Sequence, residues 1–191
     1  MLLAEKKRRT VRELDMFSQM IIIKPTMTNP NIIISKDIFP KLHRLFASNG
    51  NQFGITFPAY SFRGHGKLGS IVEILCEDRE ALAKLNLVAH FKEFEDIKVM
   101  NNINETDDYK LFRRVREKAR FEKYAERYQN RGHGREIPST MKAHNQHFNK
   151  RVFSNAYITV SSASTGQKYN IFIEPVETDN IKFNAYGLIV S

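Results

Sequence analysis

Short apolar runs, each closed by a proline, a glycine or polar residues, mark the first hundred positions of the chain. The runs at residues 20–24, 53–57 and 70–75 are rich in Ile, Val and Phe, which favours β-strands. A fourth strand is expected at residues 94–100. This part of the chain therefore predicts four strands.

Two stretches with a helical period separate these strands. Asp37 is expected to cap the first helix, which has Pro40 in its first turn and ends at Asn49-Gly50. The second helix is expected at residues 78–87, and a glycine-bearing loop is expected at residues 62–67. The resulting order, β-α-β-β-α-β, is the ferredoxin-like (RRM-like) pattern, and it predicts an α+β fold.

The pattern predicts two domains behind an N-terminal extension. The extension is residues 1–19, the ferredoxin-like domain is residues 20–100, and a smaller α+β domain with a basic helix at about 117–131 is residues 101–191. In the second domain a polar linker is expected at residues 101–108, and strands are expected at residues 157–160, 168–174 and 181–186.

One face of the predicted basic helix carries much of the chain's charge. Nine basic and three acidic residues lie between Lys110 and Arg131, and this excess of six is most of the net charge of +9. At 100° per residue, five basic side chains share one stripe: Arg116, Arg120, Lys123, Arg127 and Arg131. Such a row of guanidinium groups matches a row of phosphates, and the alternative is a merely solvated charged face.

Composition narrows the class of partner and the cellular compartment. A chain that is 41% hydrophobic and 27% charged is not globally disordered, and its basic balance indicates nucleic acid first and an anionic membrane second. Cys76 is the only cysteine, which excludes an intramolecular disulfide and fits a reducing cytoplasm. No apolar run approaches the length of a membrane span.

No cofactor or metal is expected, because the chain lacks a P-loop, a dinucleotide-binding glycine fingerprint and a paired metal-ligand helix motif. Among the six histidines, His43 is the catalytic candidate. It lies beside the apolar stripe of its helix, where a lone histidine usually serves packing or lies at the surface. Close to a basic, RNA-sized surface, an imidazole is suited to move a proton to or from a ribose hydroxyl near neutral pH.

Two further features have both a structural and a functional interpretation. The turn Ser162-Ala163-Ser164-Thr165-Gly166 offers hydroxyls and backbone N–H groups to a phosphate or ribose, although a polar hairpin turn has the same composition. Tyr169 and Tyr186 suit base stacking or orientation at a site, and they equally suit core packing.

Several segments agree in order and spacing with one family. They are Phe39-x-Lys41-Leu42-His43, Gly54-Ile55-Thr56-Phe57-Pro58, Arg114-Val115, the basic helix with Arg135-x-Ile137-Pro138, Ser162-x-Ser164-Thr165-Gly166-Gln167, and Tyr186-Gly187-Leu188. In these segments the chain resembles the type I-F CRISPR-associated endoribonuclease that cuts precursor CRISPR RNA within its repeats. The resemblance covers nearly all of the chain from Met20 onward.

The resemblance implies metal-independent cleavage at the 3′ base of a repeat stem-loop. The 2′-hydroxyl attacks the adjacent phosphate and leaves a 2′,3′-cyclic phosphate and a 5′-hydroxyl. By position, His43 is the general acid/base, Ser162 holds the ribose and the attacking hydroxyl, and Tyr186 orients the site. The enzyme is expected to stay bound to the crRNA hairpin within a type I-F surveillance complex.

The remaining matched positions imply RNA contacts. Arg114 reads a base edge near the cut, Arg127 and Arg131 bind the stem, and Tyr169 replaces a family phenylalanine that stacks on a base. Arg116 stands where the family has a base-reading glutamine, and this change favours a guanine edge over an adenine edge. Further RNA contacts are expected from Arg120, Lys123, Ser164, Thr165 and Gln167.

Two alternatives to the endoribonuclease remain from the residues alone. One is a non-catalytic RNA-hairpin module that caps the crRNA, because the geometry around His43 and Ser162 decides activity. The other is a protein that binds DNA or a membrane surface, and this alternative rests on charge alone.

Overall fold

The computed structural model describes residues 16–63, 65–116, 146–147, 149–150, 152–161 and 165–190. These residues form an α+β fold with antiparallel sheets and few helices. The strands are β1 (Met16–Ile23), β2 (Gly54–Thr56), β3 (Ser61–Arg63), β4 (His65–Lys67), β5 (Ile71–Cys76), β6 (Ile97–Val99), β7 (Asn104–Thr106), β8 (Leu111–Val115), β9 (Ala156–Ser161) and β10 (Lys168–Val176). The helical elements are α1 (Pro30–Ile33), the π-helical turn η1 (Ile34–Ile38), α2 (Phe39–Ser48), α3 (Arg79–Lys84) and α4 (Leu87–Phe91).

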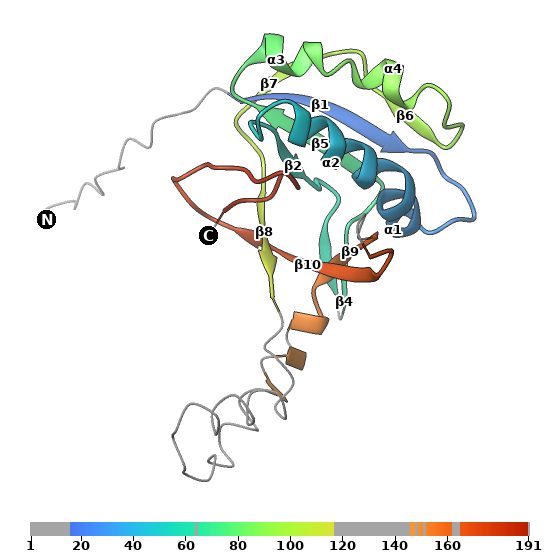
Figure 1. Ribbon diagram of the computed structural model, residues 1–191, viewed down its shortest axis with the longest axis vertical. Helices are drawn as coiled ribbons and strands as arrows, with labels where there is room; N and C mark the ends of the chain where they lie inside the picture. The colour runs from blue at the N-terminus through green and yellow to red at the C-terminus, as the bar shows by residue number, and fades with distance from the viewer. Residues whose placement is uncertain are drawn as a thin grey trace, which may run out of the picture.

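The four strands predicted in the first hundred residues share one antiparallel sheet, in the order β2-β5-β1-β6. A fifth strand, β7, pairs with Met16–Ser18 of β1, within the segment for which the sequence predicts a polar linker. The α1–α2 segment runs along one face of this sheet (Figure 1). The four predicted strands are therefore confirmed, this region contains two further strands, β3 and β4, and the linker prediction is wrong at β7.

The first strand begins four residues earlier than the sequence predicts, at Met16. Ser18 and Gln19 are buried inside it, and these two polar residues interrupt the apolar run on which the prediction rests. The Gln19 side-chain amide donates to the carbonyl of Met100 at 2.8 Å. Tertiary hydrogen bonding thus lets a polar pair occupy a central strand.

The first helical segment also begins earlier than predicted. Asn29 caps it, with its side chain accepting from the Asn31 amide, and Asp37 lies inside η1 rather than at a cap. Pro40 has no amide hydrogen, and its ring crowds the preceding turn of a helix. The chain widens there into a π-helical turn, in which the Phe39 amide bonds the Ile34 carbonyl, and so continues into α2.

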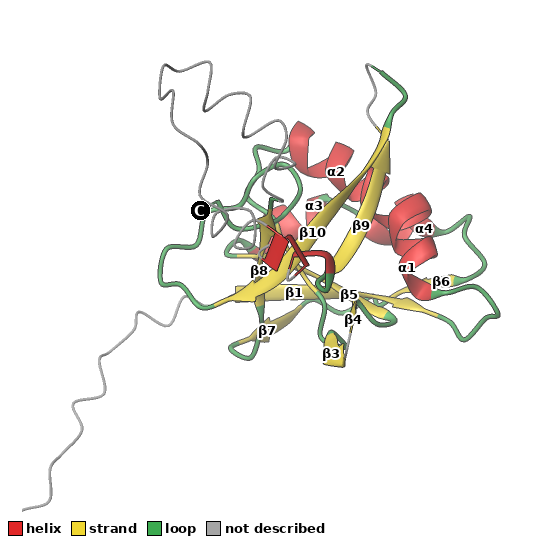
Figure 2. Cartoon of the chain, turned by 90° about the horizontal axis from the view of Figure 1, so that it is seen from below, coloured by secondary structure: helices red, strands yellow, loops and turns green. Residues whose placement is uncertain are grey.

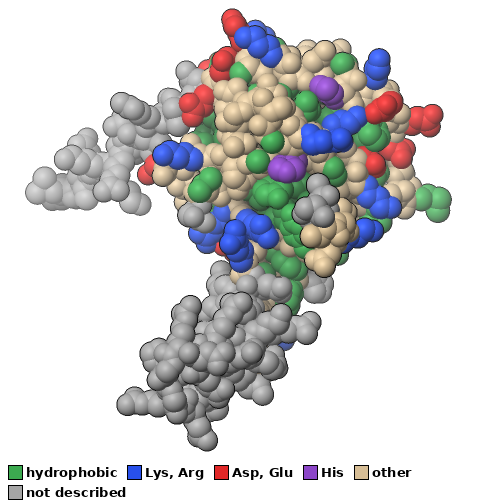
Figure 3. Space-filling model, in the orientation of Figure 1, with side chains coloured by type: hydrophobic (Ala, Val, Ile, Leu, Met, Phe, Trp, Pro, Cys, Tyr) green, Lys and Arg blue, Asp and Glu red, His purple; other side chains and the backbone are tan. Residues whose placement is uncertain are grey.

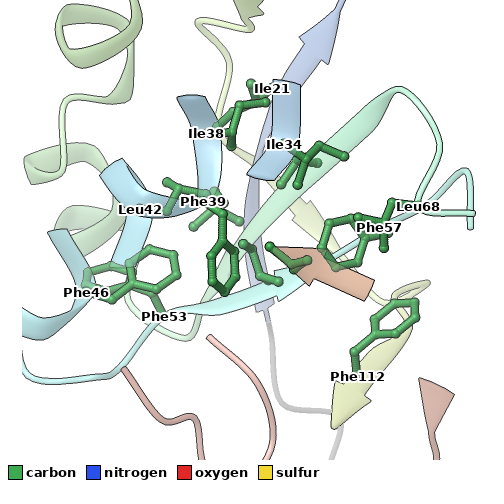
Figure 4. Close-up of a cluster of buried hydrophobic side chains, with 14 of the residues drawn as sticks. Ile21, Ile34, Ile38, Phe39, Leu42, Phe46, Phe53, Phe57, Leu68 and Phe112 are labelled. Atoms are coloured by element: carbon green, nitrogen blue, oxygen red, sulfur yellow. The ribbon is translucent and has the colours of Figure 1, made fainter. Parts of the chain in front are cut away.

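A second antiparallel sheet, β8-β10-β9, packs against the first sheet and its helices and shares their hydrophobic core (Figure 2). Ile158 and Ile171 lie directly opposite each other in this sheet and are fully buried. The core they join is built largely from α2 and the first sheet, where the labelled phenylalanines and isoleucines gather (Figure 4). The predicted hairpin of residues 157–160 and 168–174 is confirmed.

Several local expectations are corrected. In place of the loop expected at residues 62–67, β3 and β4 form a short hairpin. The predicted helix at 78–87 is split by Asn86, which adopts a left-handed conformation. Residues 181–186 form no regular strand, and Phe183 makes an isolated bridge with Ile189. Arg113–Val115 lie in β8, and the basic helix predicted at about 117–131 lies outside the described residues.

Candidate active site

His43 is held by a hydrogen bond to a backbone carbonyl from the far end of the chain. It projects from α2, is half-buried, and its Nδ1 lies 2.7 Å from the Ala185 oxygen. A carbonyl only accepts, so Nδ1 carries the hydrogen. In the neutral ring this leaves Nε2 as an acceptor, and Nε2 makes no hydrogen bond to any residue that the structure describes.

The ring of Tyr186 stacks on His43. The ring centroids are 4.4 Å apart with 18° between the planes, and Phe39 stacks on the same tyrosine at 5.9 Å. The stack comes from two neighbouring turns of the helical segment and a turn near the C-terminus. It therefore fixes the imidazole plane from one side, while the carbonyl of Ala185 fixes its rotation.

A tight turn places Ala185 and Tyr186. The Asn184 side chain accepts from the Tyr186 amide at 2.8 Å, and the Ile55 amide donates to the Gly187 carbonyl at 2.8 Å. Gly187 has φ +70°, and a Cβ there would lie 2.8 Å from Phe46. The turn thus needs glycine for both its conformation and its close approach to the core.

Tyr169 contacts Tyr186, and Arg114 in turn lies beside Tyr169. The hydroxyls of Tyr169 and Tyr186 are 3.2 Å apart, and the Arg114 guanidinium lies 5.9 Å from the Tyr169 ring centre. The hydrogen bond with Tyr169 and burial raise the pKa of the Tyr186 hydroxyl, while Arg114 opposes this. Tyr186 therefore stays protonated at neutral pH and does not act as a base there.

The stacked rings line a groove of about 1070 Å³. One wall is the α1–α2 segment and the other is the β9–β10 hairpin. Lys and Arg side chains gather around an exposed hydrophobic area on the face drawn in Figure 3, and a histidine side chain borders that area. Such an arrangement can hold a phosphodiester against an imidazole and can stack a base on an exposed aromatic ring.

Comparison with known protein families matches residues 19–191 to the family described as CRISPR-associated protein (Cas_Csy4). The match covers almost the whole chain. This protein belongs to that family. No curated protein matches the chain.

The fold brings together four of the site residues predicted in this CRISPR-associated protein: His43, Tyr186, Tyr169 and Arg114. Thr165 and Gln167 lie in the exposed turn between β9 and β10, where the Gln167 amide donates to the Thr165 hydroxyl at 3.4 Å. Arg116 is exposed just after β8. Ser162, Ser164, Arg120, Lys123, Arg127 and Arg131 lie outside the described residues.

Arg113, which contributes to the basic excess, is engaged elsewhere in this CRISPR-associated protein. Its guanidinium donates to the Glu174 carboxylate at 2.6 and 2.9 Å on the neighbouring strand. Because of this ion pair, Arg113 is not available to bind a phosphate.

The described part of the chain contains no group of three or more His, Cys, Asp or Glu placed to hold a metal ion. None of the described helices combines the length and apolar character needed to span a membrane.

Sequence reasoning missed part of the groove. Lys36, Ser35 and Tyr157 line it, and the Ala185 carbonyl orients the imidazole. The spacing of Ile32, Lys36 and His43, four and then seven residues apart, is typical of side chains that share one face of a helix. It was hidden because the sequence places the start of the helix near Asp37.

Proposed function

We propose that this protein is a metal-independent endoribonuclease that cleaves precursor CRISPR RNA at the 3′ base of the repeat stem-loop. Membership of a CRISPR-associated family supports CRISPR RNA as the substrate. The observation that carries the proposal is that two contacts hold the His43 imidazole: the hydrogen bond to the Ala185 carbonyl and the stacked ring of Tyr186. Nδ1 of the imidazole is committed to the Ala185 carbonyl, which leaves Nε2 for a substrate in the groove.

The proposed reaction is a transesterification within one ribose–phosphate unit. Nε2 of neutral His43 accepts the proton of the 2′-hydroxyl as that oxygen attacks the adjacent phosphorus. The bond from phosphorus to the 5′-oxygen breaks, and the imidazolium returns the proton to that oxygen. The products are a 2′,3′-cyclic phosphate and a 5′-hydroxyl, and no water or metal enters the balance.

Tyr186 is proposed to orient this step rather than to transfer a proton. Its raised pKa keeps the hydroxyl neutral, and its ring limits the positions open to the imidazole. Ser162, which follows the groove residue Ser161, is proposed to hold the ribose and the attacking hydroxyl. The close approach of reacting groups that such positioning provides is a large part of enzymatic rate enhancement.

We propose that a second set of residues binds the RNA. Tyr169 is proposed to stack a base, with Arg114 and Arg116 contacting base edges near the cut. Arg120, Lys123, Arg127 and Arg131 are proposed to meet stem phosphates, and Ser164, Thr165 and Gln167 are proposed to contact RNA near the scissile phosphate. The product hairpin is proposed to stay bound and to be capped within a type I-F surveillance complex.

The finer fold assignment is also a proposal. The antiparallel order β2-β5-β1-β6, with its helices, supports a ferredoxin-like arrangement for residues 20–100. Residues 101–191 are proposed as the RNA-binding domain, although their sheet shares the core of the first. The single buried thiol of Cys76 supports a cytoplasmic location.

The test is incubation with a repeat-hairpin RNA in EDTA, followed by identification of the product ends. The proposal expects one cut at the 3′ base of the stem, with cyclic phosphate and 5′-hydroxyl ends. Tight hairpin binding without any cut favours the alternative, a non-catalytic capping subunit. Products with a 5′-phosphate contradict the proposed mechanism.

A further inference from the structure

The groove that contains His43 continues well past the catalytic ring. A helix rises about 1.5 Å per residue, so Ile32 lies about 16 Å along the helical wall from His43. On the opposite wall β9 runs back from Ser161 to Tyr157, and the Thr159 amide bonds the Ser35 hydroxyl at 3.1 Å where the walls meet. The groove thus has a near end at His43 and Tyr169 and a far end at Ile32 and Tyr157.

The far end has the chemistry of a single-stranded nucleic-acid site. Lys36 and Asn31 supply donors suited to phosphate and base oxygens, and Tyr157 is 43% exposed. Lys168 and Arg44 add positive charge nearer the catalytic ring. None of the described residues that line the groove is acidic. A basic groove with an accessible aromatic ring is the usual platform for a flexible RNA strand.

The proposed reaction centre lies at the near end of the groove, at His43, and the far end extends away from it along η1 and α1. Arg114 contacts Tyr169 at the near end, where the stem base is proposed to lie. The strand that leaves with the 5′-hydroxyl departs from His43 away from that stem. We propose that the far end of the groove binds the single-stranded RNA 3′ of the cut, with a base on Tyr157 and a phosphate on Lys36; this inference rests on the proposed function.

The test compares two RNA hairpins, each carrying a 2′-deoxy nucleotide at the cut so that binding is measured without cleavage. One ends a single nucleotide past the cut, and the other extends about six nucleotides further. The wild-type protein is expected to bind the longer RNA about tenfold or more tightly. Tyr157→Ala and Lys36→Ala are each expected to bring that ratio close to one.

Two control variants remove comparable side chains from outside the groove. Phe153 packs its exposed ring on Phe172, as Tyr157 does, but it does not line the groove, so Phe153→Ala is expected to keep the ratio. Lys84→Ala removes an exposed lysine elsewhere and is also expected to keep it. Lys36→Ala is further expected to lower the salt slope of the longer RNA by about 0.7.

Three results overturn the inference: no gain from the 3′ extension in the wild type, a gain that survives both Tyr157→Ala and Lys36→Ala, or an equal gain from a 5′ extension. The proposed function is tested separately, by whether the wild type cuts the all-ribose short hairpin. A protein that cuts this hairpin but shows no gain from the extension keeps the function and loses the inference.

Discussion

The imidazole of His43 stacks on the phenol ring of Tyr186, with 4.4 Å between the centroids and 18° between the planes. One ring belongs to the first helical segment and the other to the last turn of the chain. The catalytic assignment therefore depends on the docking of the C-terminal turn as much as on the histidine itself. Substitutions in that turn should therefore change the cleavage rate with little change in RNA affinity.

Tyr186→Phe separates the ring from its hydroxyl. The stacking ring is kept, and the raised pKa means that the hydroxyl is already protonated throughout the neutral range. We expect hairpin binding within about twofold of wild type and a pH–rate profile of unchanged shape below pH of about 10. Loss of an alkaline limb of the profile in this variant would show that Tyr186 acts as an acid or base.

Tyr186→Ala removes the ring as well, and the imidazole then loses the surface that limits its position. Single-turnover cleavage should fall about a hundredfold, because a misplacement of about 1 Å has that cost in other enzymes. Hairpin affinity is expected to change much less than the rate. An equal loss in binding and in cleavage would mean that the ring serves the RNA rather than His43.

Gly187→Ala tests the turn from the core side. A methyl group there meets Phe46 and Ile55 and also strains a positive φ, so unfolding in urea should show a loss of about 1–3 kcal/mol. Gly50→Ala is the matched control, since Gly50 has φ +85° but open space around its Cβ. A smaller cost in the control, near 1 kcal/mol, isolates the packing contribution at Gly187. Equal costs would contradict the close approach.

Glu73→Gln is expected to change the pH dependence of stability. Burial raises the Glu73 pKa, a hydrogen bond with Ser18 lowers it, and the Asp108 charge raises it, with a net upward shift. Between the pKa of Glu73 in the unfolded chain and its higher pKa in the native state, the native protein keeps a proton that the unfolded chain releases. The free energy of unfolding therefore falls as pH rises through this window. The variant should have a flatter profile and be more stable than wild type above the window. An unchanged profile would place the titration elsewhere.

Arg127→Ala with Arg131→Ala should weaken hairpin binding and flatten its salt dependence, by about one unit of slope for each phosphate that the protein no longer neutralises. Arg113→Ala is the control, because its guanidinium is held by Glu174 and should not contribute to that slope. Filter binding over a range of salt concentrations measures both effects. Unchanged binding in the double variant would put the RNA on another face.

Four of the five strands of the first sheet were predictable because apolar runs closed by proline and glycine are local signals, whereas the polar β7 carries no such signal. The start of β1 was not, because Ser18 and Gln19 are buried polar residues whose partners come from distant parts of the chain. The helix start was misplaced because asparagine and aspartate cap helices about equally well, so residue type does not decide between Asn29 and Asp37. The π-helical turn before Pro40 lets the helical segment that Asn29 caps continue past Asp37 into α2.

The site was predictable in its residue types and not in its connections. His43, Tyr169 and Tyr186 were named from resemblance and chemistry, and the fold brings them into one row. The bond from His43 to the Ala185 carbonyl involves backbone, which carries no sequence signature. Tyr157 carries no local signal either, since its place in the groove depends on how the β9–β10 hairpin packs beside the α1–α2 segment.

The most direct test of the account is a paired measurement on His43→Ala: single-turnover cleavage of the repeat hairpin in EDTA, and affinity for the same hairpin with a 2′-deoxy nucleotide at the cut. We predict cleavage reduced by a factor of about a hundred or more, with affinity close to that of the wild type. Undiminished cleavage in the variant would contradict the assignment of His43 as the acid/base.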